Sequence, residues 1–155
     1  MVLVKDMSRE SAIALLQSVH LGRIACVRES QPYITPLQFA YQDHYLYSFA
    51  TVGKRIEWMR ANPLVCVEVE RIESRQRWHT IVVSGVYEEL PSTNEYLERQ
   101  TLAYNLLSKV ANWWEPGFVK TTHQGAVRPL ETVYFRIKIA EMSAHEALEE
   151  NASVA

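Results

Sequence analysis

Residues 45–69 read YLYSFATVGKRIEWMRANPLVCVEV, and this stretch carries the clearest sign of the fold. The aromatic residues up to Ala50 predict a strand, and the valines that alternate after Pro63 predict a second one. Between them, residues 53–62 are expected to form a short helix, which the Asn-Pro pair ends. The stretch therefore predicts a strand, a helix and another strand in close succession.

The loop within this stretch has the composition of an anion site. Thr51 supplies a hydroxyl, Gly53 follows it, and Lys54 and Arg55 place two adjacent cations at the first turn of the helix. Free backbone N–H groups and the positive end of the helix dipole favour a phosphate there. The alternative is an ordinary turn in which Thr51 is the N-cap and both cations are solvated. On local spacing alone, the two interpretations are equally good.

The composition indicates one globular domain with a nearly balanced charge. The 155 residues are 48% hydrophobic and contain no Gly/Ser-rich or Pro-rich linker, so a single domain is expected over residues 1–140. The acidic, alanine-rich residues 141–155 are expected to form a weakly ordered tail. Lys and Arg number 16 against 18 Asp and Glu, a net charge of -2. This balance argues against nucleic acid or a membrane surface as a partner, so any cationic site must be local.

The cysteine, histidine and N-terminal patterns exclude several other classes of protein. Cys26 and Cys66 lie in separate apolar strand patterns without CxxC spacing, which predicts buried free thiols in a reducing compartment. The histidines form no ligand-spaced pair, so no metal site is expected, and His79 is interpreted as a structural strand residue. Residues 1–5 do not resemble a signal peptide, and no stretch is long enough to span a membrane. A cytoplasmic location is therefore expected.

Hydrophobic patterns of period two predict a mainly β fold. Six strands are expected, at residues 22–27, 32–41, 45–50, 65–69, 77–90 and 132–139. Helices are expected from Ser8 to a C-cap at Leu21-Gly22, over residues 53–62, and after a capping box at residues 92–95. Hairpin-like succession without regular βαβ alternation predicts an antiparallel barrel with peripheral helices.

Pro36 and Gly85 each interrupt a strand pattern. A proline cannot donate a hydrogen bond to a ladder, so Pro36 belongs at an edge, at a bulge, or where something other than a neighbouring strand approaches the backbone. A glycine inside a long strand indicates a bend or a bulge. Both positions therefore predict a local departure from regular pairing.

Trp113 and Trp114 are adjacent in an irregular segment before the last predicted strand. Two neighbouring indoles cannot both bury easily on one face, so at least one is expected to line a groove or an interface. The alternative is a hydrophobic cap on the core. No GxSxG elbow or local Ser/His/Asp set occurs, so hydrolase chemistry has no support.

Several short segments stand in a specific order: Gly22-Arg23-Ile24-Ala25, Tyr33-Ile34-Thr35-Pro36-Leu37, Gly53-Lys54, Asn62-Pro63-Leu64-Val65, Trp78 and Val83-Ser84-Gly85. In this order the chain resembles the FMN-binding split barrel family related to pyridoxamine 5′-phosphate oxidase, including its flavin-nucleotide-binding and nitroimidazole-resistance branch. The likeness covers residues 8–139 and is specific for the family, not for one activity within it. It implies a six-stranded antiparallel split β-barrel of the Greek-key type.

The resemblance also implies that FMN lies at the interface of a homodimer. Its phosphate would lie against the anion site described above, Thr51, Gly53, Lys54 and Arg55. The edge of its isoalloxazine ring would meet the backbone of Thr35, Pro36, Leu37 and Gln38. Phe49, Ala50, Trp78 and Thr80 would flank the ring or the ribityl chain. Trp113 and Trp114 of the partner subunit would cover the flavin.

The activity that the resemblance implies is that of a small FMN-dependent oxidoreductase, with a small-molecule substrate and an electron donor such as NADH or NADPH. No catalytic side chain is assigned. The alternatives are a non-enzymatic module that binds or senses flavin, and a dimeric split barrel without a cofactor. Thr35, Gln38 and Trp78 stand where a pyridoxamine phosphate oxidase carries basic residues, so oxidation of vitamin B6 is not expected. Ser48 stands where nitroimidazole-resistance proteins often place a histidine, so drug reduction is not expected either.

Overall fold

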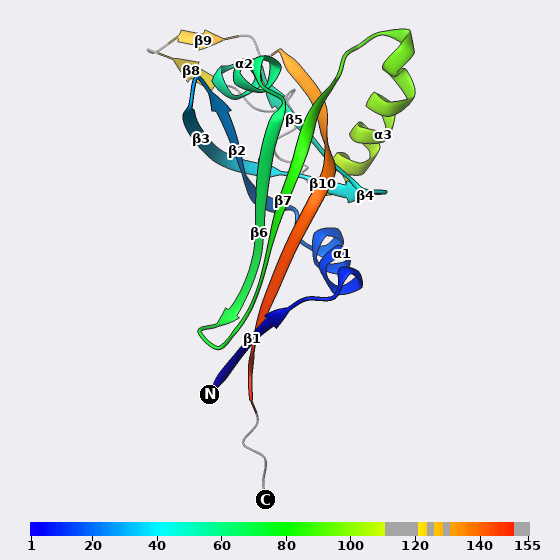
Figure 1. Ribbon diagram of the computed structural model, residues 1–155. Coiled ribbons are helices and arrows are strands. Elements are labelled where there is room, and N and C mark those ends of the chain that lie inside the picture. The colour runs from blue at the N-terminus through cyan, green and yellow to red at the C-terminus, as the bar shows by residue number, and fades with distance from the viewer. Residues whose placement is uncertain (111–120, 124–125, 129–130, 151–155) are drawn as a thin grey trace, which may run out of the picture.

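The computed structural model describes residues 1–110, 121–123, 126–128 and 131–150, and Figure 1 shows a long twisted sheet with helices around it. The helices are α1 (Arg9–Ser18), α2 (Lys54–Ala61), the 3-10 helix η1 (Asn94–Tyr96) and α3 (Leu97–Ser108). The strands are β1 (Val2–Asp6), β2 (Leu21–Arg28), β3 (Gln31–Gln38), β4 (Ala40–Gln42), β5 (Tyr45–Thr51), β6 (Leu64–Ser74), β7 (Arg77–Leu90), β8 (Thr121–His123), β9 (Ala126–Arg128) and β10 (Thr132–Glu149).

One antiparallel sheet of eight strands dominates the fold. Its order is β3-β2-β6-β7-β10-β5-β4, with β1 paired to β10, while β8 and β9 pair with each other. The predicted class, a mainly β antiparallel split barrel, is confirmed, but six strands were too few. The chain forms β1 ahead of α1, and it separates β4 from β3 at Phe39, whose N–H bonds to the carbonyl of His20 at 2.9 Å.

The inward side chains of the sheet form the main core together with α1 and α2. Phe39, Phe135 and Leu16 are fully buried there, as are Ile56 and Met59 of α2. Each such side chain contributes about 1.5 to 3 kcal/mol when it leaves water. Burial of Ile56 and Met59 fixes α2 against the sheet. Its N-terminal cations are thereby held at one end of the barrel.

A second apolar cluster attaches α3 to the sheet. Ala103 and Leu107 of α3 pack with Leu90 at the end of β7 and with Ala40 and Tyr47 of β4 and β5. All five are buried, and this cluster is separate from the main core. The helix therefore covers the part of the sheet where β7, β10 and β5 lie side by side, as Figure 1 shows.

Strand β10 corrects the prediction of a weakly ordered tail from residue 141. The strand continues to Glu149, pairs with β7 as far as Ala147, and pairs with β1 over residues 145–149. Ala147 is fully buried, and Lys5 of β1 forms an ion pair with Glu146 at 3.5 Å. The acidic and alanine-rich composition therefore belongs to a paired strand, and only residues 151–155 of the expected tail lie outside the described residues.

A register shift between Ile139 and Glu141 of β10 lies opposite Gly85 of β7. A Cβ atom at Gly85 would lie 2.6 Å from the carbonyl oxygen of Lys138, so no side chain fits there. The predicted irregularity at Gly85 is therefore confirmed, with the extra residue on the partner strand. Pro36 lies in β3, which is an edge strand of the sheet, as one of its predicted alternatives required.

The helix ends agree only in part with the predicted caps. The Ser8 side chain accepts a bond from the Ser11 N–H at 3.1 Å, which confirms the start of α1. The predicted C-cap at Leu21-Gly22 is wrong, because α1 ends at Ser18 and β2 begins at Leu21. The capping box at residues 92–95 is also wrong, because a 3-10 turn without a side-chain cap precedes α3.

Two negative findings hold for the described part of the chain. None of its helices is both long and apolar enough to cross a bilayer. None of its His, Cys, Asp and Glu side chains gather in a group of three or more that could hold a metal ion.

Candidate functional site

The N-terminus of α2 has no side-chain cap. Gly53 is the N-cap, in an extended conformation, and no side chain bonds to the first-turn N–H groups. Thr51 instead ends β5, where it pairs with Thr132 of β10. The alternative in which Thr51 caps the helix is therefore wrong. Because no cap occupies them, the first-turn N–H groups of α2 suit an anion.

Arg55 joins α2 to the edge strand β3. Its Nη1 donates to the Thr35 hydroxyl at 3.1 Å and to the Pro36 carbonyl oxygen at 2.8 Å. Burial lowers the pKa of the Arg55 guanidinium, against an opposite effect from Tyr33 and Cys26. The group stays charged at neutral pH, because arginine is effectively always protonated in proteins. Arg55 therefore links the residues expected to bind the phosphate to two of the residues expected to contact the flavin ring, Thr35 and Pro36.

Lys54 lies over two aromatic rings that the predicted site does not include. Its Nζ is 4.4 Å from the centre of the Tyr33 ring and 4.8 Å from that of Trp58. The two rings contact each other in a tilted arrangement, with their centres 5.6 Å apart. The contact between Lys54 and Trp58 could have been predicted, because residues four apart in a helix are neighbours on one face. Tyr33 shares a strand face with Thr35, which also contacts α2.

Cys26 lies behind this group of side chains on β2. It is fully buried, which raises the pKa of its thiol, while Arg55 and Lys54 act in the opposite direction. Its prediction as a buried free thiol is confirmed, whereas Cys66 is a free but exposed thiol. A protonated, enclosed thiol adds no charge to the site and leaves the two cations as its dominant electrostatic feature.

Gln38 is held in place by neighbours on both its backbone and its side chain. Its carbonyl oxygen accepts a bond from the Ser48 hydroxyl at 2.6 Å, and its Nε2 donates to the Val110 carbonyl oxygen at 3.1 Å. Its Oε1 is buried without a hydrogen-bond partner among the described residues. Leu37, the residue before it, is buried in the main core. Of the four expected β3 positions, Thr35 and Pro36 are thus the ones that contact a cation of α2.

The remaining expected residues divide between the two ends of the sheet. The rings of Phe49 and Tyr134 contact each other, with their centres 6.0 Å apart. Ala50 packs against the main core. Trp78 and Thr80 lie far from them. Val86 of β7 pairs with Leu64, the third residue after α2. Trp78 lies eight residues before Val86 on the same strand, which places the two about 26 Å apart.

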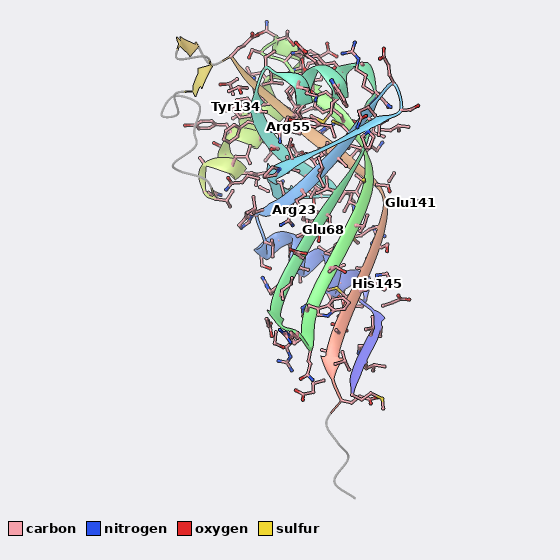
Figure 2. The ribbon with its side chains drawn as sticks, turned by 90° about the vertical axis from the view of Figure 1, so that its left-hand side faces the viewer. Arg23, Arg55, Glu68, Tyr134, Glu141 and His145 are labelled. Atoms are coloured by element: carbon pink, nitrogen blue, oxygen red, sulfur yellow. The ribbon has the colours of Figure 1, made fainter. Side chains whose placement is uncertain are left out.

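Figure 2 shows the same separation: Arg55 lies toward one end of the sheet, and His145, which pairs with Thr80, lies well toward the other. A single chain therefore does not bring Trp78 and Thr80 to the cations. Trp113 and Trp114 lie outside the described residues. Their expected place over the flavin stays a prediction.

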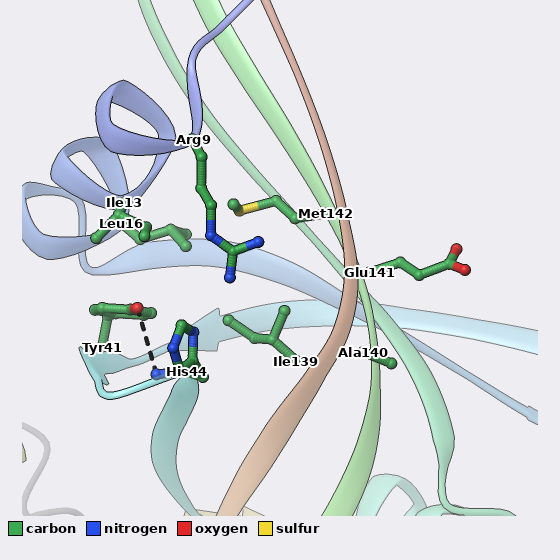
Figure 3. A pocket seen from close by; sticks show the side chains of 9 residues that line it. All are labelled: Arg9, Ile13, Leu16, Tyr41, His44, Ile139, Ala140, Glu141 and Met142. Atoms are coloured by element: carbon green, nitrogen blue, oxygen red, sulfur yellow. Dashed lines mark hydrogen bonds between the residues drawn. The ribbon is translucent and has the colours of Figure 1, made fainter.

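The described residues form several hollows, and none of those described below contains the cations of α2. A small cavity of about 90 Å³ lies between α1, the β4–β5 turn and β10. Figure 3 shows Arg9, Tyr41 and His44 at this cavity, while Glu141 points away from it. The His44 N–H donates to the Tyr41 hydroxyl at 3.3 Å. The cavity is lined otherwise by aliphatic side chains and is distinct from the site at α2.

A larger hollow of about 350 Å³ lies on the outward face of β2, β6 and β7. We call this surface the outer apolar face; it is formed by Ala25, Val27, Leu64, Cys66, Ser84 and Val86. Leu64 is 65% exposed there, although leucine is among the residues most often buried. Trp78 and Thr80 alternate with the inward Ile81 and Val83 and so share this outward side of β7.

Comparisons with known proteins agree with the geometry. A family model described as pyridoxamine 5′-phosphate oxidase matches residues 8–146. An uncharacterised protein of Rhizobium meliloti is 37% identical over 144 residues, which cover 93% of this chain and 95% of the relative. The structure of an FAD-binding protein from Mesorhizobium loti has a TM-score of 0.78 and 38% identity, over 96% of this chain and 100% of that one.

The fold is shared more widely than the sequence. The structure of a candidate 5-nitroimidazole antibiotic resistance protein from Bacteroides thetaiotaomicron has a TM-score of 0.68 at 14% identity, over 95% of this chain and 89% of that one. Identity this low shows the fold alone. The resemblance stated from the sequence is confirmed by the family match and by the two close relatives. The chain belongs to the pyridoxamine 5′-phosphate oxidase family.

Proposed function

We propose that this protein is a homodimeric flavoprotein that binds FMN, with the FMN phosphate at the N-terminus of α2. The observation that carries the proposal is the pair of bonds from Arg55 to Thr35 and Pro36, because they join a phosphate-type helix terminus to an edge strand. The relative from Mesorhizobium loti, 38% identical to this chain, is an FAD-binding protein, which supports a flavin at this position.

The donors present fit a phosphate monoester. The first-turn N–H groups of α2 have no side-chain cap, and Thr51, Lys54 and Arg55 surround them in the chain. A hydrogen bond to a charged group contributes about 1.5 to 3 kcal/mol, so the two cations and the helix terminus would each add to the affinity for a phosphate. In this arrangement Lys54 and Arg55 neutralise the phosphate, and Arg55 fixes its distance from β3.

Strand β3 would orient the ring. The Pro36 nitrogen carries no hydrogen, so no ladder bond is lost where the ring would approach this edge. Thr35 and Pro36 are held by Arg55, and Phe49 and Ala50 lie near the end of β5, a few residues before α2. A bound flavin supplies hydride and electron transfer, whereas these residues hold and orient it.

The second subunit completes the proposed site. Trp78 and Thr80 lie far from a flavin bound at α2 of their own chain. They stand eight and six positions, about 26 and 20 Å, from Val86, which pairs with Leu64 just after α2. A second copy packed in the opposite direction on the outer apolar face would bring its own Trp78 and Thr80 to that flavin. Exposed Leu64 and Val27 on this face support a copy of the same chain as the occupant.

The visible absorption spectrum tests the proposal. Protein mixed with FMN and freed of excess ligand should keep flavin bands, and Lys54→Ala/Arg55→Ala should fold but lose them. Arg60→Ala is the matched control, since Arg60 lies on the same helix but pairs with Glu89. Equal retention of FMN by wild type and the double variant would refute the phosphate site.

The same sample separates the two proposed classes of activity. We propose a small oxidoreductase that takes electrons from NADH or NADPH, and either donor should then bleach the bound flavin. A flavin that stays oxidised with both donors would favour the alternative of a binding or sensing module. A colourless protein that FMN does not reconstitute would leave only the cofactor-less dimer.

A further inference from the structure

The small cavity between α1, the β4–β5 turn and β10 has a polar side and an apolar side. Arg9, Tyr41 and His44 form the polar side, as Figure 3 shows. The apolar side consists of aliphatic side chains and one thioether, those of Ile13, Leu16, Ile139 and Met142. The volume of about 90 Å³ equals that of roughly three water molecules in the liquid. The cavity therefore has room for a molecule of about three to five non-hydrogen atoms.

The bulge of β10 keeps the nearest carboxylate out of this cavity. The register of β10 shifts between Ile139 and Glu141, and the Ile139 N–H donates to the His44 carbonyl oxygen at 3.1 Å. A bulge changes the direction in which the following side chains point. Figure 3 shows the Glu141 carboxylate pointing away from the cavity and from Arg9. The one acidic residue among those that line the cavity therefore does not neutralise the guanidinium.

Arg9 has no partner for its charge within the described part of the chain. No carboxylate there lies at ion-pair distance, and no hydrogen bond engages its guanidinium, whereas Arg60 and Arg136 each pair with a glutamate. The Tyr41 hydroxyl accepts a bond from the His44 N–H at 3.3 Å, so its own hydrogen is left to donate. A charged donor and a neutral donor thus stand at one cavity, and neither has an acceptor among the described residues.

We propose that this cavity binds a short-chain monocarboxylate such as acetate or propionate. The carboxylate would accept hydrogen bonds from the Arg9 guanidinium and the Tyr41 hydroxyl. The alkyl chain would lie against Leu16, Ile139 and Met142. Water alone would satisfy the polar side but not these apolar walls, and inorganic phosphate has no apolar part to set against them. The site is separate from the flavin site at α2 and does not depend on it.

Titration of the ¹⁵N-labelled protein with sodium propionate tests the site, with two-dimensional NMR as the measurement. The amide signals of Arg9, His44 and Ile139 should shift and reach saturation, and sodium chloride at the same ionic strength should not reproduce these shifts. Propionamide has the same shape but no charge, so it should bind about tenfold more weakly or worse. Hexanoate should also bind at least about tenfold more weakly, because its chain exceeds the cavity.

Variants locate the carboxylate within the cavity. Arg9→Gln should weaken propionate about tenfold and still fold, because Arg9 is exposed and has no partner among the described residues. Tyr41→Phe should weaken propionate by a smaller factor, since it removes a neutral donor. Arg75→Gln changes an exposed arginine in the turn between β6 and β7, and as the control it should leave the affinity unchanged.

Three outcomes would each overturn the site: equal binding of propionate and propionamide, an unchanged affinity in Arg9→Gln, or no saturable shift of the Arg9, His44 and Ile139 amides. Retention of FMN by Arg9→Gln, measured from its absorption spectrum, should equal that of the wild type. A failure of the carboxylate site would therefore leave the proposed flavin site untouched, and a failure of FMN binding would leave the carboxylate site untouched.

Discussion

Replacement of Arg55 by alanine should affect stability and flavin binding together. Its guanidinium makes two hydrogen bonds to β3, one of them at 2.8 Å to the Pro36 carbonyl oxygen. A bond from a charged donor contributes about 1.5 to 3 kcal/mol, and the two acceptors on β3 share one donor atom. Arg55→Ala should therefore lower the free energy of unfolding by about 1.5 to 3 kcal/mol, measured by urea denaturation of the apoprotein.

Arg55→Ala should also weaken FMN binding by at least tenfold, since each 1.4 kcal/mol of binding free energy lost is about a factor of ten in Kd. Arg55→Lys keeps a positive charge but loses the planar fork, so it should recover part of the FMN affinity and little of the bond to β3. The expected order of FMN affinity is wild type, then lysine, then alanine.

Lys54→Ala separates the two effects. Lys54 contacts two rings, and an exposed cation–π contact contributes about 0.5 to 1 kcal/mol, so the free energy of unfolding should fall by no more than about 1 kcal/mol. FMN affinity should fall as it does for Arg55→Ala. If Arg55→Ala leaves both the unfolding energy and the Kd of FMN unchanged, Arg55 is neither a link between α2 and β3 nor a phosphate ligand.

Three further predictions concern the sheet. Leu64→Asp on the outer apolar face should convert a dimer to a monomer of 17.9 kDa in light scattering. Gly22→Ala should lower the free energy of unfolding by about 1 to 3 kcal/mol, because its Cβ would lie 2.5 Å from a carbonyl oxygen of β6. For Glu89, burial acts to raise the pKa, but hydrogen bonds from Arg60 and Tyr87 lower it overall. Glu89→Gln should therefore cost about 0.2 to 1 kcal/mol at pH 7, and this difference should shrink as the pH falls through the ordinary pKa of a glutamate and vanish below the lowered pKa of Glu89.

Two of these have a control in the same chain. Tyr104→Asp changes an exposed ring on α3 and should leave the mass of the dimer unchanged. Gly53→Ala has its nearest neighbour at 4.0 Å and should fall within about 0.5 kcal/mol of wild type. A dimeric Leu64→Asp, an unaffected Gly22→Ala or a constant Glu89→Gln difference would each contradict its reasoning.

The local parts of the site could be predicted from sequence because they depend on neighbours in the chain. Strand β5, the basic loop and α2 follow one another, so their order was readable, and Lys54 and Arg55 begin the helix as expected. The alternative with Thr51 as a cap is wrong because pairing of β5 with β10 continues through Thr51. Tyr33 and Trp58 were missed because their contact depends on how α2 packs on β3.

The last predicted strand ended at residue 139, whereas β10 continues to Glu149, because the alternation of apolar and polar residues changes phase within it. Before the bulge, Val133, Phe135 and Ile137 face inward; after it, Met142 and Ala144 take the inward positions. A bulge adds one residue and shifts the phase of a strand by one position. A pattern read at constant period therefore loses the strand at the bulge. The acidic residues beyond it then look like a tail, although the strand stays paired with β7 as far as Ala147 and with β1 over residues 145–149.

The separation of Lys54 from Thr80 has a consequence for binding as well as for shape. If one flavin contacts Lys54 of one chain and Thr80 of the partner subunit, flavin binding and dimer formation must strengthen each other by the same factor. Leu64→Asp should therefore weaken FMN although Leu64 contacts no part of the proposed phosphate site, and FMN should lower the dimer dissociation constant of the wild type. Analytical ultracentrifugation with and without FMN measures this factor. A Leu64→Asp monomer that binds FMN as tightly as the wild-type dimer would show that one chain holds the complete site.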